Sequence, residues 1–341
     1  MKKLTAFLLT CTMIVGLSAC GSGGGSSAAS SSNQETSKNA SAESTSGSSA
    51  ESKSTSEITP ETVTLTHSMG EIEVSYNPQK IAVLDLAALD ILDSLGLGDR
   101  VVGIPKKSSV SYLTSYIDDE NIANLGSVKE VDMEALNALE PDMIFIGGRL
   151  SSEYENISAI APTYLLQVDR EKGYMNSVND NVKAIASVFG EEEKAEELLS
   201  GFDGRVEALK ASAEGKTTMI GIVTSGSMST LGDDSRCSLI GNEIGFENVS
   251  DEVDSTHGDS ASFELVLEKN PDYVFILDRD TAINAEDAKT AKDVMENEII
   301  MKTAAYQNDT IVYLTPDVWY LSEGGITATD TMLSDLEAGM K

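Results

Sequence analysis

The chain has 341 residues, of which 40% are hydrophobic, and this length allows two domains of ordinary size with a core in each. It carries 56 acidic residues against 24 basic ones, which gives a formal net charge of −32. This charge argues against nucleic acid, or the anionic surface of a membrane, as a direct partner. It also makes any group of arginines informative, because the background charge opposes an anionic ligand.

The N-terminus has the features of a secretory signal. Two lysines precede an apolar run from Leu4 to Leu17, which is shorter than a typical membrane span. The run ends at Leu17-Ser18-Ala19-Cys20, which resembles the lipobox of bacterial lipoproteins. The resemblance implies that residues 1–19 are removed and that Cys20 is lipidated; a plain secretory signal with an incidental cysteine is the alternative. Lipidation would anchor the chain to the cell membrane without a spanning segment.

Residues 20–57 begin with Cys20 and continue with mainly Ser, Gly, Ala, Thr, Asn, Glu and Lys. This composition cannot bury enough apolar surface to fold, so we expect a disordered tether. Cys11 leaves with the signal and Cys20 carries lipid, so Cys237 is the one cysteine left, and the mature chain has no partner for an intrachain disulfide.

Residues 58–173 alternate strand and helix patterns, which predicts an α/β lobe with a mostly parallel sheet. A β-hairpin is expected at 62–76, a helix at 87–95, and strands at 81–84, 101–105 and 163–166. The pattern of the next region, 174–213, predicts one helix at 174–189 and a second helix whose apolar residues form a stripe at 195–209.

Residues 214–341 repeat the alternation and predict a second α/β lobe. The expected elements are a strand at 219–224, a polar segment at 225–235, a helix at 238–244, a strand at 311–314 and a closing helix at 327–336.

One stretch occurs in both lobes. Residues 134–149 and 264–279 each read Glu, six residues, Pro-Asp, one residue, a short apolar run and, after two more residues, Arg, and the two copies lie 130 residues apart. Each copy predicts a short helix, a buried strand and an arginine at the carboxyl end of that strand, where open α/β sheets bind ligands. The two lobes should therefore present Arg149 and Arg279 from equivalent edges.

The sequence has none of the common catalytic signatures, such as a nucleophile elbow, a phosphate-binding loop, His-Glu-x-x-His or Cys-x-x-Cys. We therefore expect a binding protein rather than an enzyme. Of its two histidines, His67 lies in the predicted hairpin and is expected at the surface. His257 lies in a Thr-His-Gly loop just before the second repeat, between Arg236 and Arg279 in sequence.

Taken together, several segments resemble the substrate-binding lipoproteins of iron–siderophore ABC transporters, and most closely those for ferric catecholates of the petrobactin type. The matching segments are 85–103, both repeats, Ser235-Arg236, Thr256-His257-Gly258 and Trp319-Tyr320-Leu321. The resemblance extends from Thr62 to the C-terminus. It implies the fold of class III periplasmic binding proteins, with two α/β lobes joined by a long connecting helix in 174–213. It also implies a monomer without an intrinsic cofactor, which captures an Fe(III)–siderophore complex between its lobes and delivers it to an ABC importer.

The resemblance also implies the binding residues. Arg149, Arg236 and Arg279 match the arginine trio of the cleft, and His257 and Tyr320 match residues that complete the iron's coordination when the siderophore is tetradentate. The residue chemistry agrees, since guanidinium is a planar donor fork for anionic oxygens and phenolate suits hard Fe(III). As alternatives, Arg149 and Arg279 could pair with nearby acids such as Asp278 or Glu153, and Arg236 could be a surface turn residue. His257 could hydrogen-bond within its loop without contacting iron, and Tyr320 could serve core packing.

Two departures from the family pattern leave the ligand open. Cys237 follows Arg236 where family members often have Phe, and Glu323 adds an acid near the site. A same-fold binder of heme or cobalamin, or of a bare transition metal ion, is the alternative function.

The wider family also implies that Glu134 and Glu264 dock on the permease dimer. The alternative is an ordinary first-turn glutamate favoured by the helix dipole. The lipobox and tether suggest an extracytoplasmic protein anchored on a Gram-positive surface.

Overall fold

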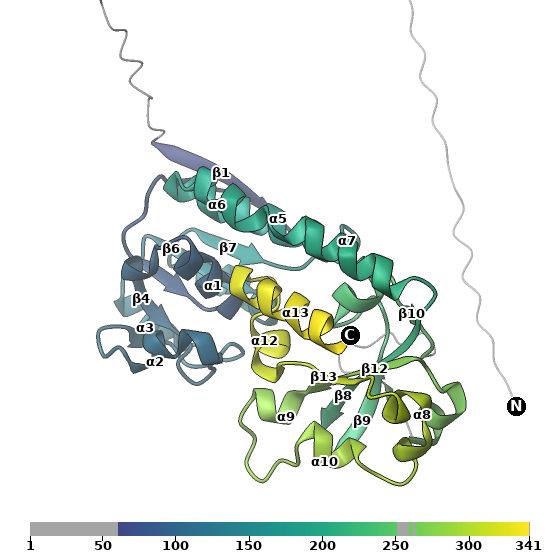
Figure 1. Cartoon of the computed structure of the whole chain (residues 1–341). Coiled ribbons are helices and arrows are strands. Elements are labelled where there is room, and N and C mark those ends of the chain that lie inside the picture. Colours follow the sequence, from purple (N-terminus) through teal and green to yellow (C-terminus); the bar gives the residue numbers. More distant parts are fainter. Residues whose placement is uncertain (1–60, 251–258, 261–262, 341) are drawn as a thin grey trace, which may run out of the picture. The chain divides into compact units, whose positions relative to one another are not determined.

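The computed structural model describes residues 61–250, 259–260 and 263–340, so Cys20, the tether and His257 lie outside the described residues. Within those ranges, no helix combines the length and apolar character needed to cross a membrane. The described elements form two lobes, each built on its own sheet (Figure 1).

The first lobe has a five-stranded sheet in the order β5-β4-β3-β6-β7, and every pairing in it is parallel. Its strands are β3 (Ile81–Val83), β4 (Val101–Ile104), β5 (Ala123–Asn124), β6 (Met143–Gly147) and β7 (Thr163–Leu166). Its helices are α1 (Leu86–Ser94), α2 (Thr114–Asp118), α3 (Met133–Ala138) and α4 (Tyr154–Ser158). The expected hairpin, β1 (Thr62–His67) and β2 (Gly70–Ser75), forms a separate antiparallel sheet. The predicted α/β alternation is confirmed.

Three consecutive helices run from the first sheet toward the second (Figure 1). They are α5 (Tyr174–Phe189), α6 (Glu192–Leu199) and α7 (Phe202–Ala213). The long helix α5 matches its predicted bounds and ends at Gly190, whose φ of 73° is the left-handed cap that glycine favours. The second helix expected here is in fact two helices, because the chain breaks at Ser200 and Gly201.

The second lobe has a six-stranded mixed sheet in the order β11-β9-β8-β12-β13, with β10 paired to β8. The strands are β8 (Thr217–Thr224), β9 (Ser227–Leu231), β10 (Glu247–Asn248), β11 (Asp259–Ser260), β12 (Tyr273–Asp278) and β13 (Ile311–Tyr313). The helical segments are a π-helical turn at Leu239–Glu243, α8 (Phe263–Lys269), α9 (Arg279–Ala282), α10 (Ala291–Met295) and α11 (Ala304–Gln307).

The polar segment expected at 225–235 contains the antiparallel strand β9, which the sequence analysis did not predict. Ser225 and Gly226 both have positive φ, 52° and 73°, which suits the two-residue turn of a hairpin. Met228 and Leu231 are buried, so β9 makes apolar contacts with the core. The serines and the threonine of this strand gave the segment the composition of a loop.

The sequence repeat is also a structural repeat. In each copy a short helix, α3 or α8, precedes a central strand, β6 or β12, and the residue before the proline has positive φ, 47° at Glu140 and 43° at Asn270. The following aspartate fastens the strand to its neighbour. Asp142 accepts hydrogen bonds from the backbone N–H of Gln79 and Lys80 at 2.9 and 2.8 Å, and Asp272 accepts one from Thr217 at 2.9 Å. This fastening explains why Pro-Asp recurs.

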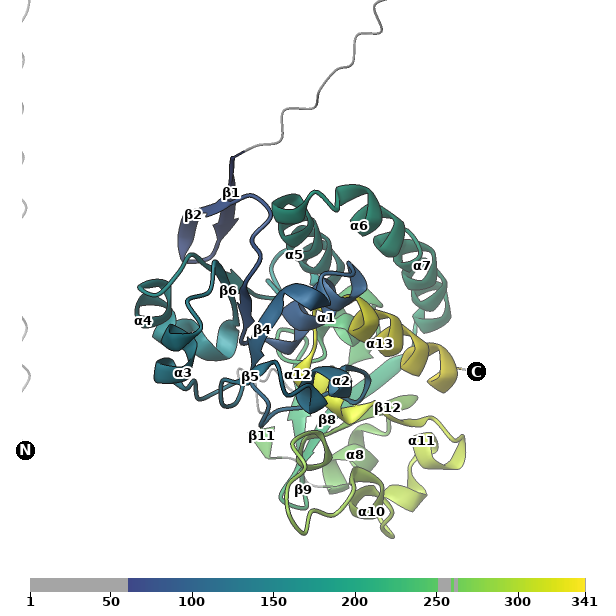
Figure 2. The ribbon, with the colours of Figure 1, turned by 90° about the vertical axis from the view of Figure 1, so that its left-hand side faces the viewer.

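The C-terminal segment contacts both lobes. It contains α12 (Pro316–Leu321) and α13 (Ile326–Gly339), and α13 packs between α1 and α7 (Figure 2). Asp90 on α1 accepts hydrogen bonds from the first backbone N–H groups of α13, those of Thr327 and Ala328, at 3.0 and 2.9 Å. The Tyr112 hydroxyl donates a hydrogen bond to Asp90 at 2.9 Å, and its oxygen lies 3.1 Å from the Ser322 hydroxyl. The C-terminal residues 322–328, which the sequence analysis assigned to the second lobe, are therefore hydrogen-bonded to the first lobe.

Candidate functional site

The local fold brings four predicted site residues to one region. Arg149 lies in the 3-10 turn Gly148–Glu153 directly after β6, and Arg279 begins α9 directly after β12. Both arginines thus follow the carboxyl end of a central strand, as the repeat predicted. Arg236 comes from the loop after β9, and Tyr320 lies on α12.

The three arginines converge on Tyr320. Their Cζ atoms lie 5.5, 4.5 and 5.8 Å from the centroid of the tyrosine ring for Arg149, Arg236 and Arg279, respectively, within the range of cation–π interactions. Arg149 and Arg236 donate hydrogen bonds to the backbone carbonyl of Tyr320 at 2.5 and 3.1 Å, and Arg279 donates one to its phenol oxygen at 3.1 Å. Guanidinium groups from both lobes therefore surround one aromatic side chain.

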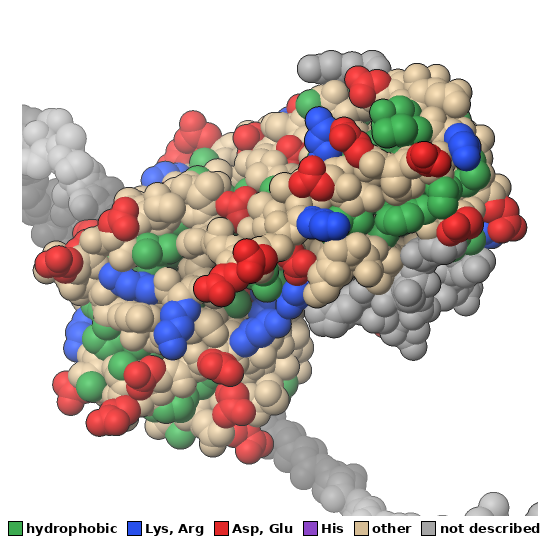
Figure 3. Space-filling view, turned by 90° about the horizontal axis from the view of Figure 1, so that it is seen from below, with side chains coloured by type: hydrophobic (Ala, Val, Ile, Leu, Met, Phe, Trp, Pro, Cys, Tyr) green, Lys and Arg blue, Asp and Glu red, His purple; other side chains and the backbone are tan. Residues whose placement is uncertain are grey.

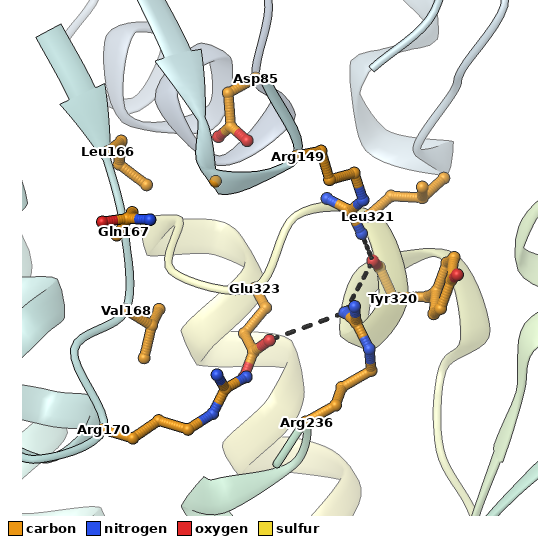
Figure 4. Close-up of a pocket in the computed structure, with 11 residues that line it drawn as sticks. Asp85, Arg149, Leu166, Gln167, Val168, Arg170, Arg236, Tyr320, Leu321 and Glu323 are labelled. Carbon is orange, nitrogen blue, oxygen red and sulfur yellow. Dashed lines mark hydrogen bonds and ion pairs between the residues drawn. The ribbon is translucent and has the colours of Figure 1, made fainter. Parts of the chain in front are cut away.

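A cleft opens on both sides of Tyr320. One cavity, of about 330 Å³, is drawn in Figure 4, and the other, of about 180 Å³, lies next to Arg279. Both cavities are lined by Arg149, Tyr320 and Leu321. The cleft is thus bordered by the first lobe, the second lobe and α12 together.

The lining of the cleft is rich in positive charge although the chain is acidic. Among the described residues, the basic ones are Lys107, Lys129, Arg149, Arg170, Arg236 and Arg279, and the acidic ones are Asp85 and Glu323. Figure 3 shows Lys and Arg side chains grouped toward the middle of one face, with acidic side chains among them and around the rim. Lys107, Lys129 and Arg170 were missed by sequence reasoning. Lys107 lies in the loop after the strand predicted at 101–105, and Lys129 lies in the loop after the short parallel strand β5. Such a position after a parallel strand is the sequence feature that could have identified these two lysines.

The partners of the arginines differ from the acids considered in the sequence. Arg279 Nη1 lies 3.2 Å from Asp280, whereas Asp278 accepts hydrogen bonds from the backbone of Thr281 and Ala291. Arg236 is 8% exposed, so it is a buried residue of the cleft wall and not a solvent-facing turn residue.

The buried position of Arg149 is unfavourable for its positive charge. Burial and the nearby Arg236 guanidinium lower the pKa of Arg149, while Asp85, Tyr320 and Glu323 act in the opposite direction. Arginine nevertheless stays protonated in proteins. Its charge is therefore held in an unfavourable place, and a bound anion would relieve the repulsion between the two guanidinium groups.

Tyr320 is 2% exposed and packs in the core, yet its phenol faces positive charge. Burial alone would raise the pKa of Tyr320. The hydrogen bond from Arg279 and the charges of Arg236, Arg279 and Lys129 outweigh burial and lower that pKa below its ordinary value. The site thus lowers the free energy needed to form the phenolate, which is a ligand suited to Fe(III).

Comparison with known proteins gives consistent matches. The family model for periplasmic binding proteins matches residues 81–318. The chain is 33% identical over 346 residues to the petrobactin-binding protein YclQ of Bacillus subtilis strain 168, with 100% of both chains covered. In structure it resembles the iron uptake ABC transporter substrate-binding protein PiuA of Streptococcus pneumoniae, with a TM-score of 0.77, 35% identity, and coverage of 82% of this chain and 99% of the other. It also resembles the catecholate-siderophore binding protein VctP of Vibrio cholerae, with a TM-score of 0.75, 31% identity, and coverage of 82% and 100%.

Proposed function

The chain belongs to the periplasmic binding protein family, and from this premise we propose that it captures a ferric siderophore of the catecholate type and delivers it to an ABC importer. The observation that carries the proposal is the convergence of Arg149, Arg236 and Arg279 from two lobes on one cleft. The protein acts as a binding protein and not as an enzyme, and iron is its cargo rather than a resident cofactor.

The chemistry of the cleft suits such a cargo. A ferric catecholate is an anion with planar catechol rings, and its oxygens accept hydrogen bonds in the plane of each ring. Guanidinium groups match that geometry with their donor forks, and they are more weakly hydrated than ammonium groups. Because the rest of the chain is strongly acidic, the local group of cations is the feature that makes an anion bind here and not elsewhere.

We assign Tyr320 and His257 as iron ligands for a tetradentate siderophore, which leaves two of the metal's positions open. The lowered pKa of Tyr320 supports the assignment, since less free energy is then needed to form the phenolate. His257 lies outside the described residues, and its role rests on its position in the sequence between Arg236 and Arg279.

We further propose that Cys20 is lipidated and that the protein works as a monomer outside the cell, on a Gram-positive surface. The lipobox-like sequence and the Ser/Gly-rich residues 21–57 support this assignment. Glu134 and Glu264, both exposed in the first turns of α3 and α8, would dock on the permease dimer. Their equivalent positions give one contact per lobe, as a two-fold partner requires.

A fluorescence-quenching panel tests the proposed function. The buried indole of Trp319 precedes Tyr320 in α12, so ligand at the site should quench its emission. The panel contains ferric catecholate, ferric hydroxamate and ferric citrate complexes, with heme, cobalamin and free Zn²⁺ or Mn²⁺ as controls. Saturable quenching by the catecholate at lower concentrations than by every other compound is expected. Tighter binding of heme, cobalamin or a free metal ion would contradict the proposal.

A further inference from the structure

The two cavities beside Tyr320 differ in charge. We call the one next to Arg279 the cationic cavity; among the described residues, its charged lining consists of Lys107, Lys129, Arg149 and Arg279, without an acidic side chain. We call the one drawn in Figure 4 the mixed cavity; it is lined by Arg149, Arg170 and Arg236, but also by Asp85 and Glu323. In the described part of the chain, a ligand that spans Tyr320 therefore meets only basic charged side chains at one end, and two carboxylates among three arginines at the other.

Glu323 is poorly paired where it stands. Its side chain is 10% exposed, and one carboxylate oxygen, Oε2, lies 3.8 Å from Arg236 Nη1, which is too long for a hydrogen bond. The other oxygen, Oε1, is buried without a hydrogen-bond partner among the described residues, and so is Nε of Arg236. Burying a carboxylate oxygen without a hydrogen bond costs free energy. Because Glu323 lines a binding cavity, a hydrogen-bond donor of the ligand could supply the missing bond.

Asp85 adds a second carboxylate to the same wall. Its Oδ1 atom caps α1 by accepting hydrogen bonds from the backbone N–H groups of Ala87 and Ala88 at 2.9 and 3.1 Å. Its Oδ2 atom occupies space that only a glycine leaves free, since a Cβ atom on Gly147 would lie 2.0 Å from it. Figure 4 shows the Asp85 side chain projecting toward the cavity, on the side opposite Arg170.

These two carboxylates disfavour a ligand that is negative along its whole length. A polyanion would gain from the arginines but would lie against Glu323, where like charges in a poorly solvated site repel. A ligand with a positive charge at that point would instead complete the pairing of Glu323. The difference in charge between the two cavities thus discriminates between ligands by the part that does not bind the iron.

We propose that Glu323 is a specificity-determining residue that selects ferric chelates with a protonated amine in their backbone. The anionic iron–catecholate part lies against the cationic cavity and Tyr320, and the amine donates its N–H groups to Glu323 in the mixed cavity. This inference rests on the proposed function and narrows its ligand class.

The test uses two synthetic ferric bis-catecholate complexes with linkers of equal length. One linker carries a secondary amine, which is protonated at neutral pH, and the other carries an ether oxygen at the same position. Quenching titrations measure both dissociation constants for the parent protein and for Glu323→Gln, which keeps the shape of the side chain and removes its charge. Glu298→Gln serves as the control, because Glu298 is an exposed glutamate of the same lobe and lines neither cavity.

The parent protein and Glu298→Gln should bind the amine complex about tenfold more tightly than the ether complex, which corresponds to about 1.4 kcal/mol. Glu323→Gln should bring the ratio close to one, chiefly by weakening the amine complex. Because each ratio is measured within one preparation, a partly unfolded variant does not distort it. Equal binding of both complexes by the parent, or an unchanged ratio in Glu323→Gln, overturns the inference and leaves the proposed function standing. Binding of neither complex by the parent overturns both.

Discussion

The Nε atom of Arg279 donates a hydrogen bond to the phenol oxygen of Tyr320 at 3.1 Å. This contact links the arginine at the end of the second repeat to a helix, α12, whose following residues are bound to the first lobe through Tyr112 and Ser322. The charge at the end of β12 therefore acts directly on the aromatic side chain that lies between the two cavities.

Arg279→Gln should raise the pKa of Tyr320. In the parent protein the hydrogen bond and positive charge of Arg279 stabilise the phenolate and oppose the effect of burial, so their loss favours the protonated phenol. The pKa can be measured as the difference between ultraviolet phenolate titrations of each protein and of its Tyr320→Phe counterpart. Arg205 lies on α7 and pairs with Asp330 of α13, and it lines neither cavity, so Arg205→Gln should leave the titration unchanged. A Tyr320 pKa that is the same with and without Arg279 would contradict this account.

Arg236→Ala should weaken binding of a ferric catecholate by about ten- to hundredfold, because hydrogen bonds to charged groups contribute about 1.5–3 kcal/mol. The loss also leaves the carboxylate of Glu323 without its nearest cation, which adds repulsion toward an anionic ligand. Affinity is measured by Trp319 quenching and folding by thermal melting.

Arg205→Ala is the matched control, since Arg205 forms ion pairs with Asp330 and Glu337 outside the cleft. It should lower the melting temperature without changing affinity. If Arg236→Ala bound the catecholate as tightly as Arg205→Ala does, Arg236 would have no part in recognition.

Asp335→Ala should destabilise the protein and disturb the site together. Asp335 on α13 accepts hydrogen bonds from Trp319 Nε1 at 2.8 Å and from the backbone N–H and hydroxyl of Thr315 at 2.7 and 3.0 Å. Removing it leaves three donors at α12 unpaired, for which we expect a loss of about 2–4 kcal/mol in the free energy of unfolding. Denaturant unfolding measures that loss, and quenching measures the accompanying fall in affinity.

The control for this variant is Asp330→Ala, which removes an exposed carboxylate from the same helix. Exposed ion pairs contribute little, so its stability should change by less than about 1 kcal/mol. Similar losses for the two variants would mean that Asp335 does not hold α12 in place.

The sequence predicted the parts of the site that depend on local pattern. The repeat placed Arg149 and Arg279 correctly at the ends of two buried strands, because a helix, a proline and an apolar run specify that unit locally. Strand β9 was missed because its alternation uses Ser and Thr, which also suit a loop. Whether Arg170 lines the cleft depends on how distant segments meet, and no spacing in the chain encodes that directly.

The double variant Glu134→Ala with Glu264→Ala should bind ferric catecholate normally but fail to support its uptake. Both side chains are exposed and line neither cavity, so the ligand does not meet them. Each lies in the first turn of a helix, where a negative charge contributes about 0.3–1 kcal/mol, so only a small fall in melting temperature is expected. Uptake of the iron complex is measured in cells that rely on the introduced variant.

The matched control is Glu155→Ala with Glu298→Ala, which removes one exposed glutamate from each lobe outside the repeat. This pair produces the same change in net charge and should leave uptake intact, so a loss seen only in the first pair cannot come from general charge. Each single variant, Glu134→Ala or Glu264→Ala, should reduce uptake partly, because a two-fold permease would still hold the other lobe. Normal uptake by the double variant at normal protein levels would assign the two glutamates to helix stabilisation alone, and docking would then have to use another surface.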